Sequence, residues 1–559
     1  MFNSKQKQLF SSGEKKSTTS VTSPFVQAGL KKSAETLSGN GALKYSTTGN
    51  SFVDQFGVLG SYKQPRTFEQ IANDCELLWS QNKLLTVIFI LYIRMITRVV
   101  NLFNGASTKT SQKGAELKHE GIVRMIWLHI KSPSTFWKNI GLFISVGSWK
   151  DIITMLSYDL QYHGWKNRIL DWDKFGKLIL TGLENPNTSE LIKKYLPQIK
   201  ANSKCHTIEA QADNMIAKWI CSLLYSSKEE SSWTYKQYRK LKSSGTAHQW
   251  QQLISKRQFE RIDFNTIHGR ALSLLVRGKF LDTSGLRAKY GEWITKPETK
   301  DVKYTGFVHE LFSVCRKYGS LVKMPKEEAE TINKQFTTLV KKGGESEQTS
   351  LIVVRDTSSS MGSTATGTNM SCYDIAKALA LYFSEFLKGE FQNAWIEFNS
   401  NAQMHSWIGH SPLDKWYNDR SSYVGSTNFQ SVIQLFVKLL HSGIKEQDFP
   451  TGILCISDAE FNSTQLKLTN VEQAKQTLLD GGFSQEYVNN FIIVLWNLQS
   501  RAYGPTTGKK FETYGDVPNV FYFSGYSAAT ISFLTSKIMN ASELFEAAMS
   551  QEILEMVEL

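Results

Sequence analysis

Residues 351–362 of the chain have the sequence LIVVRDTSSSMG, in which four apolar residues are followed by a polar run at 356–360. The apolar residues predict a short buried strand, and the polar run marks its carboxyl end, where open α/β sheets bind ligands. Asp356, Ser358 and Ser360 alternate, so their oxygen-bearing side chains can face one point. One carboxylate and two hydroxyls suit a hard divalent cation such as Mg²⁺. A Ser-rich turn without a metal is the alternative interpretation.

The sequence after this stretch alternates between helical and strand patterns. The predicted elements are a helix over 371–387, a strand at 395–398, a helix at 429–440 after a turn at 425–428, and a strand at 452–457. Thr427 lies in that turn, and Asp458 follows the last strand. In a parallel sheet these two residues would lie at the same edge as the Asp-Ser-Ser loop.

Together these residues resemble a von Willebrand factor A (vWA) domain with a metal-ion-dependent adhesion site. The family pattern of Asp-x-Ser-x-Ser, a later Thr and a later Asp matches Asp356, Ser358, Ser360, Thr427 and Asp458. The resemblance implies that the three hydroxyls bind Mg²⁺ or another divalent cation directly, and that the carboxylates bind it directly or through water. It also implies an open coordination position for an acidic residue of a protein partner. Arg355, directly before the first Asp, departs from the family pattern.

Length, composition and charge indicate a globular chain with two or more domains. It has 559 residues, of which 41% are hydrophobic, and a formal net charge of +13. From Ser350 onward there are 13 Lys and Arg against 21 Asp and Glu, net −8, which leaves 51 against 30, net +21, before it. A polyanionic partner would therefore bind the first half. A lysine-rich solvated surface would give the same charge without a partner.

Cysteine usage and hydropathy predict a cytoplasmic or otherwise intracellular protein without a membrane partner. The amino terminus lacks the apolar core of a secretory signal, and the longest apolar run, Leu84 to Ile93, is too short to span a bilayer and predicts a buried helix. No Cys-x-x-Cys pair is present, which predicts free thiols and neither a disulfide framework nor a zinc site. The scattered cysteines are Cys75, Cys205, Cys221, Cys315, Cys372 and Cys455.

The pattern along the chain predicts an α plus α/β fold class. Residues 1–45 are rich in Ser, Thr, Lys and Gly with little periodicity, whereas from Phe68 the pattern is helical without strand alternation. Such a run of helices predicts an α-solenoid or an irregular helical array. The predicted parts are a flexible arm at 1–45, a helical domain at 46–324, a linker with a helix and a hinge at 325–348, an α/β domain at 349–540 and a C-terminal helix at 541–559.

Short motifs between residues 45 and 540 resemble, in the same order, the landmarks of a family of unknown function that joins a TROVE-like helical half to a vWA half. They are YSTTGN and FVD within 45–54, GSWKD at 147–151, WQQLISKRQFERIDF at 250–264, SDAEF at 457–461, LWNL at 495–498 and FSGY at 523–526. In architecture this family is similar to the Ro autoantigen ring proteins, whose HEAT-like helices close into a ring through the vWA domain and bind structured or misfolded RNA. The resemblance implies a HEAT-like helical array, with ring closure left open, followed by a vWA or Rossmann-like doubly wound sheet, and RNA as a partner.

The densest basic and aromatic cluster of the chain lies within residues 233–245. Its predicted RNA-contacting residues are Tyr235, Lys236, Tyr238, Arg239, Lys240 and Lys242. Cations attract phosphates irrespective of sequence, and aromatic faces stack on unpaired bases. A solvated helix face has the same pattern, so both interpretations stay open.

The sequence offers little support for an enzyme, because it contains no phosphate-binding loop, nucleophile elbow or His-Glu-x-x-His motif. Asp458 and Glu460 could form an acid and base pair, but the metal role already accounts for Asp458 and leaves Glu460 without a role. We therefore expect a non-enzymatic RNA-binding protein with a Mg²⁺-binding second half, and no DNA partner. The alternative is a metal-dependent protein–protein adaptor without nucleic acid.

Overall fold

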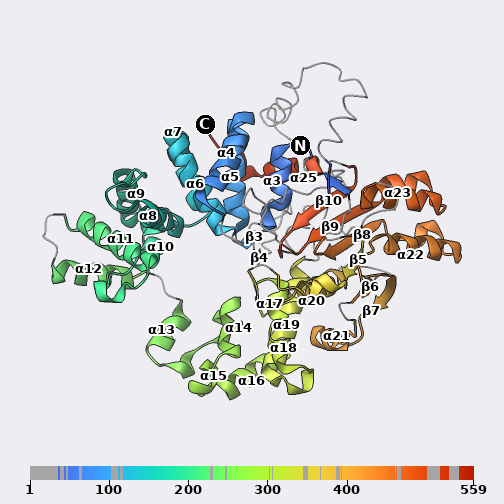
Figure 1. Cartoon of the computed structure of the whole chain (residues 1–559). Coiled ribbons are helices and arrows are strands. Elements are labelled where there is room, and N and C mark those ends of the chain that lie inside the picture. Colours follow the sequence, from blue (N-terminus) through green and yellow to red (C-terminus); the bar gives the residue numbers. More distant parts are fainter. Residues whose placement is uncertain are drawn as a thin grey trace. The chain divides into compact units, whose positions relative to one another are not determined.

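The computed structural model of the chain describes most residues outside the amino-terminal arm and several loops, and Figure 1 draws the others in grey. The described residues are 48–61, 66–97, 117–226, 231–245, 248–267, 269–300, 302–304, 306–343, 351–365, 367–385, 391, 393–421, 424–459, 461–462, 468–499, 517–527 and 541–559. The arm predicted over 1–45 lies outside them, except for the backbone of two antiparallel strands, β1 (Glu35–Leu37) and β2 (Leu43–Tyr45). A second such pair is β3 (Val99–Asn101) and β4 (Ser111–Lys113).

The chain forms two compact units, each of which is made of segments that are not contiguous in sequence. Unit 1 comprises Met1–Arg66, Ile96–Leu117 and Ile267–Gln551, and unit 2 comprises Thr67–Met95, Lys118–Thr266 and Glu552–Leu559. The amino-terminal half is helical, and the carboxyl-terminal half contains a six-stranded mixed sheet with helices. The predicted α plus α/β class is confirmed as a helical first half followed by a mixed sheet with helices.

Unit 2 is built of helices. Thr67 begins the first helix with a capping box, in which its hydroxyl accepts from the Gln70 N–H and the Gln70 side chain accepts from the Thr67 N–H. The apolar run at 84–93 lies within the second helix and is buried, as predicted. The helices are α4 (Phe68–Gln81), α5 (Lys83–Thr97), α6 (Lys118–Lys131), α7 (Pro133–Val146), α8 (Trp149–His163), α9 (Trp172–Glu184), α10 (Pro186–Tyr195), α11 (Ile208–Leu224), α12 (Ser232–Ser243) and α13 (Gln249–Ser255).

The GSWKD motif at 147–151 forms the corner between α7 and α8. Asp151 is buried and accepts hydrogen bonds from Nε and Nη2 of Arg94, both at 2.8 Å, and from the Ser148 N–H at 2.8 Å. This bidentate pair joins α5 to the start of α8. A Cβ on Gly147 would lie 2.3 Å from Asp151 Oδ2 and 2.6 Å from the Phe143 carbonyl oxygen. The corner therefore requires glycine beside the buried ion pair.

The sheet of unit 1 has the strand order β10-β9-β8-β5-β6-β7 (Figure 1). All neighbouring strands are parallel except β6 and β7, which are antiparallel. The strands predicted at 351–354, 395–398 and 452–457 are confirmed. The strands are β5 (Leu351–Asp356), β6 (Ala394–Phe398), β7 (Ala402–Ser406), β8 (Gly452–Ser457), β9 (Ile492–Asn497) and β10 (Val520–Ser524).

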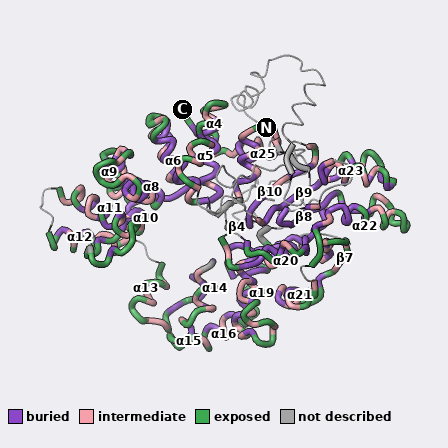
Figure 2. The backbone as a smooth tube through the Cα atoms, in the orientation of Figure 1, coloured by how far each residue is buried: buried purple, intermediate pink, exposed green. Residues whose placement is uncertain are grey.

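Helices cover both faces of this sheet, so its central strands are buried (Figure 2). Helix α20 (Cys372–Ser384) packs on β5, β6 and β8. Apolar residues of α22 (Gln430–His441), α23 (Asn470–Asp480) and α24 (Gln485–Asn490) share one core with Ile352 and Val354 of β5, on the other face.

The remaining helices of unit 1 come from both halves of the sequence. Helix α19 occupies most of the predicted linker, whereas the hinge predicted after it lies outside the described residues. These helices are α3 (Ser51–Val58), α14 (Arg270–Arg277), α15 (Phe280–Thr283), α16 (Arg287–Thr295), α17 (Val308–Phe312), α18 (Cys315–Tyr318), α19 (Lys326–Gly343), α21 (Pro412–Asn418) and α25 (Ala541–Met549).

Segments from the two ends of the chain pack together beside β10. Ser524 Oγ donates to the Gly57 carbonyl at 3.1 Å, and a Cβ on Gly60 would lie 1.8 Å from the Ser524 carbonyl oxygen. Phe545 of α25 packs on Phe52 of α3 with ring centroids 6.0 Å apart. Residues within the predicted helical domain therefore complete the α/β unit.

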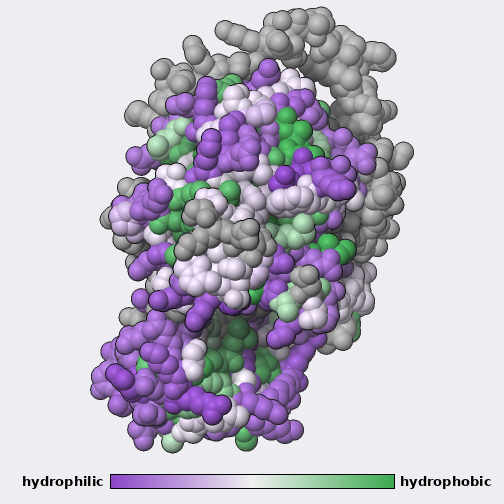
Figure 3. Space-filling model, turned by 90° about the vertical axis from the view of Figure 1, so that its left-hand side faces the viewer, coloured by the Kyte–Doolittle hydropathy of each residue, from purple (hydrophilic) through white to green (hydrophobic). Residues whose placement is uncertain are grey.

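Two further features of the molecule are the hydropathy of its helices and surface, and the state of its cysteines. Among the helices that the structure describes, none is long and apolar enough to cross a membrane, and the face drawn in Figure 3 is largely hydrophilic. All six cysteines are buried free thiols.

We expect Gly147→Ala to lower the free energy of unfolding by about 1–3 kcal/mol, because the added methyl group overlaps the buried Asp151 carboxylate. Urea denaturation followed by far-UV circular dichroism measures this change. The control is Gly141→Ala in α7, where a Cβ meets no atom within 4 Å and helix propensity favours alanine. Equal stability of the two variants would contradict this account of the corner.

Candidate functional site

The strand order reverses between β5 and β8. The chain runs from β5 to β6 on one side, and later returns to β8 on the other side of β5. Open α/β sheets bind ligands outside the carboxyl ends of the strands at such a switch point. Asp356 is the last residue of β5 and Asp458 directly follows β8. Sheet topology therefore places both predicted carboxylates at the switch point.

The first loop brings Asp356, Ser358 and Ser360 together. Asp356 is fully buried, and its Oδ1 accepts the Ser358 N–H at 2.8 Å. The Ser358 and Ser360 hydroxyl oxygens lie 3.1 Å apart. The alternation noted in the sequence therefore does gather the serine hydroxyls.

The loop that carries Thr427 is hydrogen-bonded to both neighbouring loops. Ser359 N–H donates to the Gly425 carbonyl at 3.1 Å, and Asn462 N–H donates to the Thr427 carbonyl at 2.9 Å. Gly425 has φ +79°, and a Cβ there would lie 2.6 Å from Ser400 Oγ, so this turn requires glycine. The structure brings the three predicted loops together. Convergence of all five side-chain oxygens on one ion stays a prediction.

Electrostatics at the switch point favour a cation. Burial and the neighbouring charge of Asp458 raise the pKa of Asp356 to about 7, against the opposite effect of hydrogen bonds from Ser457 and Ser358. Burial, followed by the charges of Asp458 and Asp356, also raises the pKa of the Cys372 thiol to about 12. Two buried carboxylates that repel each other would be stabilised by a divalent ion between them.

The donor chemistry fits Mg²⁺ better than a transition metal. In the described part of the chain, no three His, Cys, Asp or Glu side chains are grouped so as to hold a metal. The five predicted donors are two carboxylates and three hydroxyls, all of them oxygen, and such a set would suit a hard cation. A bound divalent ion would neutralise the charges of Asp356 and Asp458.

Ser457 is a site residue that the sequence analysis did not predict as such. Its hydroxyl donates to Asp356 Oδ2 at 2.5 Å and accepts from the Ala459 N–H at 3.0 Å. It therefore fixes both the orientation of Asp356 and the turn after β8, where Ala459 has φ +62°. A hydroxyl residue directly before the later Asp was the available signal. Glu460, which had no predicted role, lies outside the described residues.

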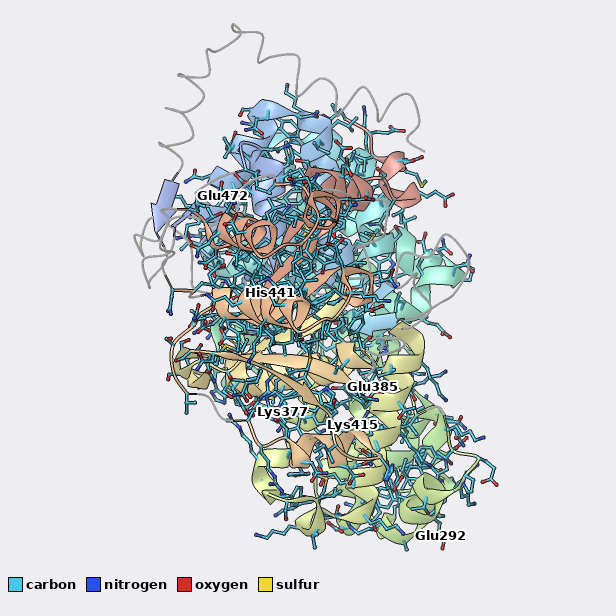
Figure 4. All side chains as sticks on the ribbon, turned by 90° about the vertical axis from the view of Figure 1, so that its right-hand side faces the viewer. Glu292, Lys377, Glu385, Lys415, His441 and Glu472 are labelled. Carbon is cyan, nitrogen blue, oxygen red and sulfur yellow. The ribbon has the colours of Figure 1, made fainter. Side chains whose placement is uncertain are left out.

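Arg355 is the residue that departs from the family pattern. Its side chain lies on the other face of the sheet from Asp356, because side chains alternate along a strand. It is buried, with Nη1 2.7 Å from Asp419, and its guanidinium lies 4.4 Å from the ring centroid of Tyr373. Lys377 of α20, labelled in Figure 4, lies 3.2 Å from the same Asp419 carboxylate. Burial alone would raise the pKa of Asp419, but the two cations hold it well below its usual range. The arginine therefore has a structural partner of its own.

The predicted RNA-contacting cluster lies on α12 of unit 2, and one of its residues needs correction. Tyr238 is fully buried, and its hydroxyl donates to the Pro197 carbonyl at 3.0 Å, so its ring is not available to a base. Thr234, one turn earlier, is also buried, and together they define the inward face of the helix. Tyr235 is half-buried. Sequence spacing could not show which tyrosine faces inward.

The cations of α12 lie mostly on its outer face. Lys236, Arg239 and Lys240 are exposed at i, i+3 and i+4 spacing, which places them on one side. Lys242 instead reaches the Lys194 carbonyl at 3.4 Å, and burial lowers its pKa. The exposed Lys194 of α10 is therefore next to α12. We call Lys236, Arg239 and Lys240 the basic surface.

We expect Mg²⁺ to raise the thermal midpoint of unit 1, because an ion that binds only the folded state stabilises it by about 2.7 kcal/mol at roughly 100 times its Kd. Asp458→Asn should abolish this rise by removing one of the two carboxylates. Differential scanning calorimetry with and without Mg²⁺ measures it. Asp448→Asn, an exposed residue of the same unit, is the control. An equal Mg²⁺ effect in both variants would refute the site.

We expect Ser457→Ala to weaken Mg²⁺ binding by about 10–100-fold, because residues that orient a metal ligand have effects of this size. Isothermal titration calorimetry with Mg²⁺ measures the change. Ser442→Ala, an exposed hydroxyl at the end of α22, should bind as the wild type does. If Ser457→Ala bound Mg²⁺ with unchanged affinity, the hydrogen bond from Ser457 to Asp356 would not contribute to Mg²⁺ binding.

Comparison with known families covers only the carboxyl-terminal part of the chain. Residues 350–557 match the model of a family described as a domain of unknown function, DUF7788, which spans a little over a third of the sequence. No curated protein matches the chain. The matched region contains all five predicted metal-binding residues and Ser457.

Proposed function

We propose that the protein is a non-enzymatic, intracellular RNA-binding protein whose carboxyl-terminal part is a vWA-type domain with a Mg²⁺ site. In this proposal the helices of unit 2 form a TROVE-like, HEAT-like array that carries the RNA. The observation that carries the proposal is the pair of buried carboxylates at the switch point, of which Asp356 accepts hydrogen bonds from Ser358 and Ser457.

Three oxygen-rich loops support the metal part of the proposal. Asp356 and Asp458 supply the charge, and Ser358, Ser360 and Thr427 supply hydroxyls, as the resemblance implies. Ser457 orients the first carboxylate. The ion would hold the three loops in one arrangement and present its open position to an acidic group.

The basic surface supports the RNA part of the proposal. Its cations are exposed on unit 2, which belongs to the half of the sequence with net charge +21. Trp233, one turn before Lys236, is 45% exposed and could stack on an unpaired base. This contact set replaces Tyr238 by Trp233 and leaves out Lys242.

A metal-dependent protein–protein adaptor is the second candidate. The observation in its favour is Val424, which is 54% exposed although its N–H donates to the Thr357 carbonyl in the Asp-Ser-Ser loop. An apolar side chain beside a metal with an open position suits a protein partner that supplies a carboxylate. In that case EDTA or Asp356→Ala would abolish partner binding, and RNA would not bind.

We expect RNA affinity to fall steeply with salt, and the triple variant Lys236→Gln, Arg239→Gln, Lys240→Gln to reduce the log–log slope by about 2 to 3. Filter binding of structured and single-stranded RNA over a salt series measures the slope. The control variant removes the same charge at Lys150, Lys166 and Lys177, which are exposed elsewhere in unit 2. Equal slopes for the two triple variants would argue against the basic surface, and no RNA binding would favour the adaptor.

A further inference from the structure

Strand β7 forms one edge of the six-stranded sheet, with β6 as its strand neighbour (Figure 1). The two strands are antiparallel, and their register runs without a bulge over residues 402–406 of β7. Two hydrogen bonds flank this ladder. The Trp407 N–H donates to the Asn393 carbonyl at 2.9 Å, and the Asn399 N–H donates to the Asn401 carbonyl at 3.0 Å. These bonds fix which residues of β7 face β6 with their backbone groups, because hydrogen-bonded and non-hydrogen-bonded pairs alternate along an antiparallel ladder.

The alternation leaves the backbone groups of Ala402, Met404 and Ser406 on the outer side of β7. Each of these residues forms a non-hydrogen-bonded pair with β6, so its N–H and C=O point away from the sheet. Within the described ranges, no hydrogen bond joins these groups to another segment. Met404 is also 45% exposed. The outer side of β7 therefore offers a row of donors and acceptors to another strand.

The sequence of β7 lacks the usual protection of an edge strand. Lysine, proline or a bulge commonly prevents such strands from pairing, but residues 402–406 are AQMHS, with no Lys, Arg, Asp, Glu or Pro. The other edge strand, β10, differs, because α3 and η1 (Leu59–Ser61) pack against it. Its Ser524 hydroxyl donates to the Gly57 carbonyl at 3.1 Å. The sheet thus has one edge packed against other segments and one that is open among the described residues.

The residues of β7 are self-complementary in an antiparallel pair centred on Met404. In that register the Met404 N–H of each copy would donate to the Met404 carbonyl of the other. Ala402 would exchange the same two bonds with the partner's Ser406, so every outward backbone group would be paired. Met404 would lie opposite Met404, and Gln403 opposite the partner's His405, so no like charges would face each other.

We propose that β7 pairs with β7 of a second copy of this chain, which joins the two sheets across a two-fold axis. Such a contact uses the same surface on both copies and therefore closes on itself. Because β10 packs against α3 and η1, the assembly would stop at a dimer and would not extend into a fibre. The proposal depends neither on the Mg²⁺ site nor on RNA binding.

Sedimentation velocity over a series of protein concentrations tests the proposal. We expect a monomer–dimer equilibrium without larger species. Met404→Lys should raise the dimer Kd by about tenfold or more, because two ammonium groups would lie opposite each other on the axis. Met404 is exposed, so circular dichroism should show a retained fold. Met215→Lys is the matched control, since Met215 is 39% exposed on α11 of unit 2, and it should dimerise as the wild type does.

A cross-linking experiment tests the register. The Cα atoms of a hydrogen-bonded antiparallel pair lie about 5.5 Å apart, within the roughly 4.4–6.8 Å that a disulfide spans. Met404→Cys should therefore form an interchain disulfide with oxidised glutathione, seen by non-reducing electrophoresis, whereas Met215→Cys should not. The six native cysteines are buried and should not contribute.

Three results would overturn the proposal. One is a wild-type chain that stays monomeric at every concentration, which would leave the β7 edge to a strand of another protein. Another is a Met404→Lys dimer as tight as that of the wild type, and the third is a Met404→Cys chain that forms no more interchain disulfide than Met215→Cys.

Discussion

The hydrogen bond from Ser457 to Asp356 joins two parallel strands, β8 and β5, at the point where the strand order of the sheet reverses. The rest of the candidate site depends on it, because it holds a buried carboxylate at the end of β5 close to the charge of Asp458 at the end of β8. Burial of one carboxylate near another is unfavourable, and this cost persists only where a ligand or a surrounding structure compensates it. The hydrogen bonds from Ser358 and Ser457 compensate it in part, and a divalent ion would do so more fully.

Because side chains alternate between the two faces of a strand, the Asp356 carboxylate is separated from the neighbouring Arg355 guanidinium. Arg355 and Asp356 are adjacent in sequence but belong to opposite faces of β5. Arg355 forms its own buried network with Asp419 and Lys377, beneath α20. One strand therefore carries a buried ion pair on one face and, at its carboxyl end, a carboxylate that a metal could complete. The arginine anchors the strand without neutralising the candidate site.

The short motifs that resemble family landmarks have local structural roles where the structure describes them. Asn50 caps α3 through the N–H groups of Phe52 and Val53. Gly147 and Asp151 form the corner that Arg94 closes. Gly525 packs on Gly60, so the FSGY motif near the end of the chain packs against a segment near its beginning. Such positions tolerate few residue types, because a cap, a close backbone approach and a buried ion pair each fix the side chain. The order of these motifs in the sequence therefore reflects the fold, whereas Ser457 and Asp458 of SDAEF also belong to the candidate site.

Local patterns in the sequence determined the strands at 351–354, 395–398 and 452–457, the buried helix at 84–93 and the clustering of Ser358 with Ser360, because each follows from hydrophobic periodicity or alternation over a few residues. Only the tertiary structure decided that Ser457 orients Asp356, that Tyr238 faces inward while Lys236 faces outward, and that helices before residue 324 complete the α/β unit. Those facts depend on which segments, distant in sequence, pack together. The packing is set by the apolar area that the whole core buries, and no single stretch of sequence determines that area.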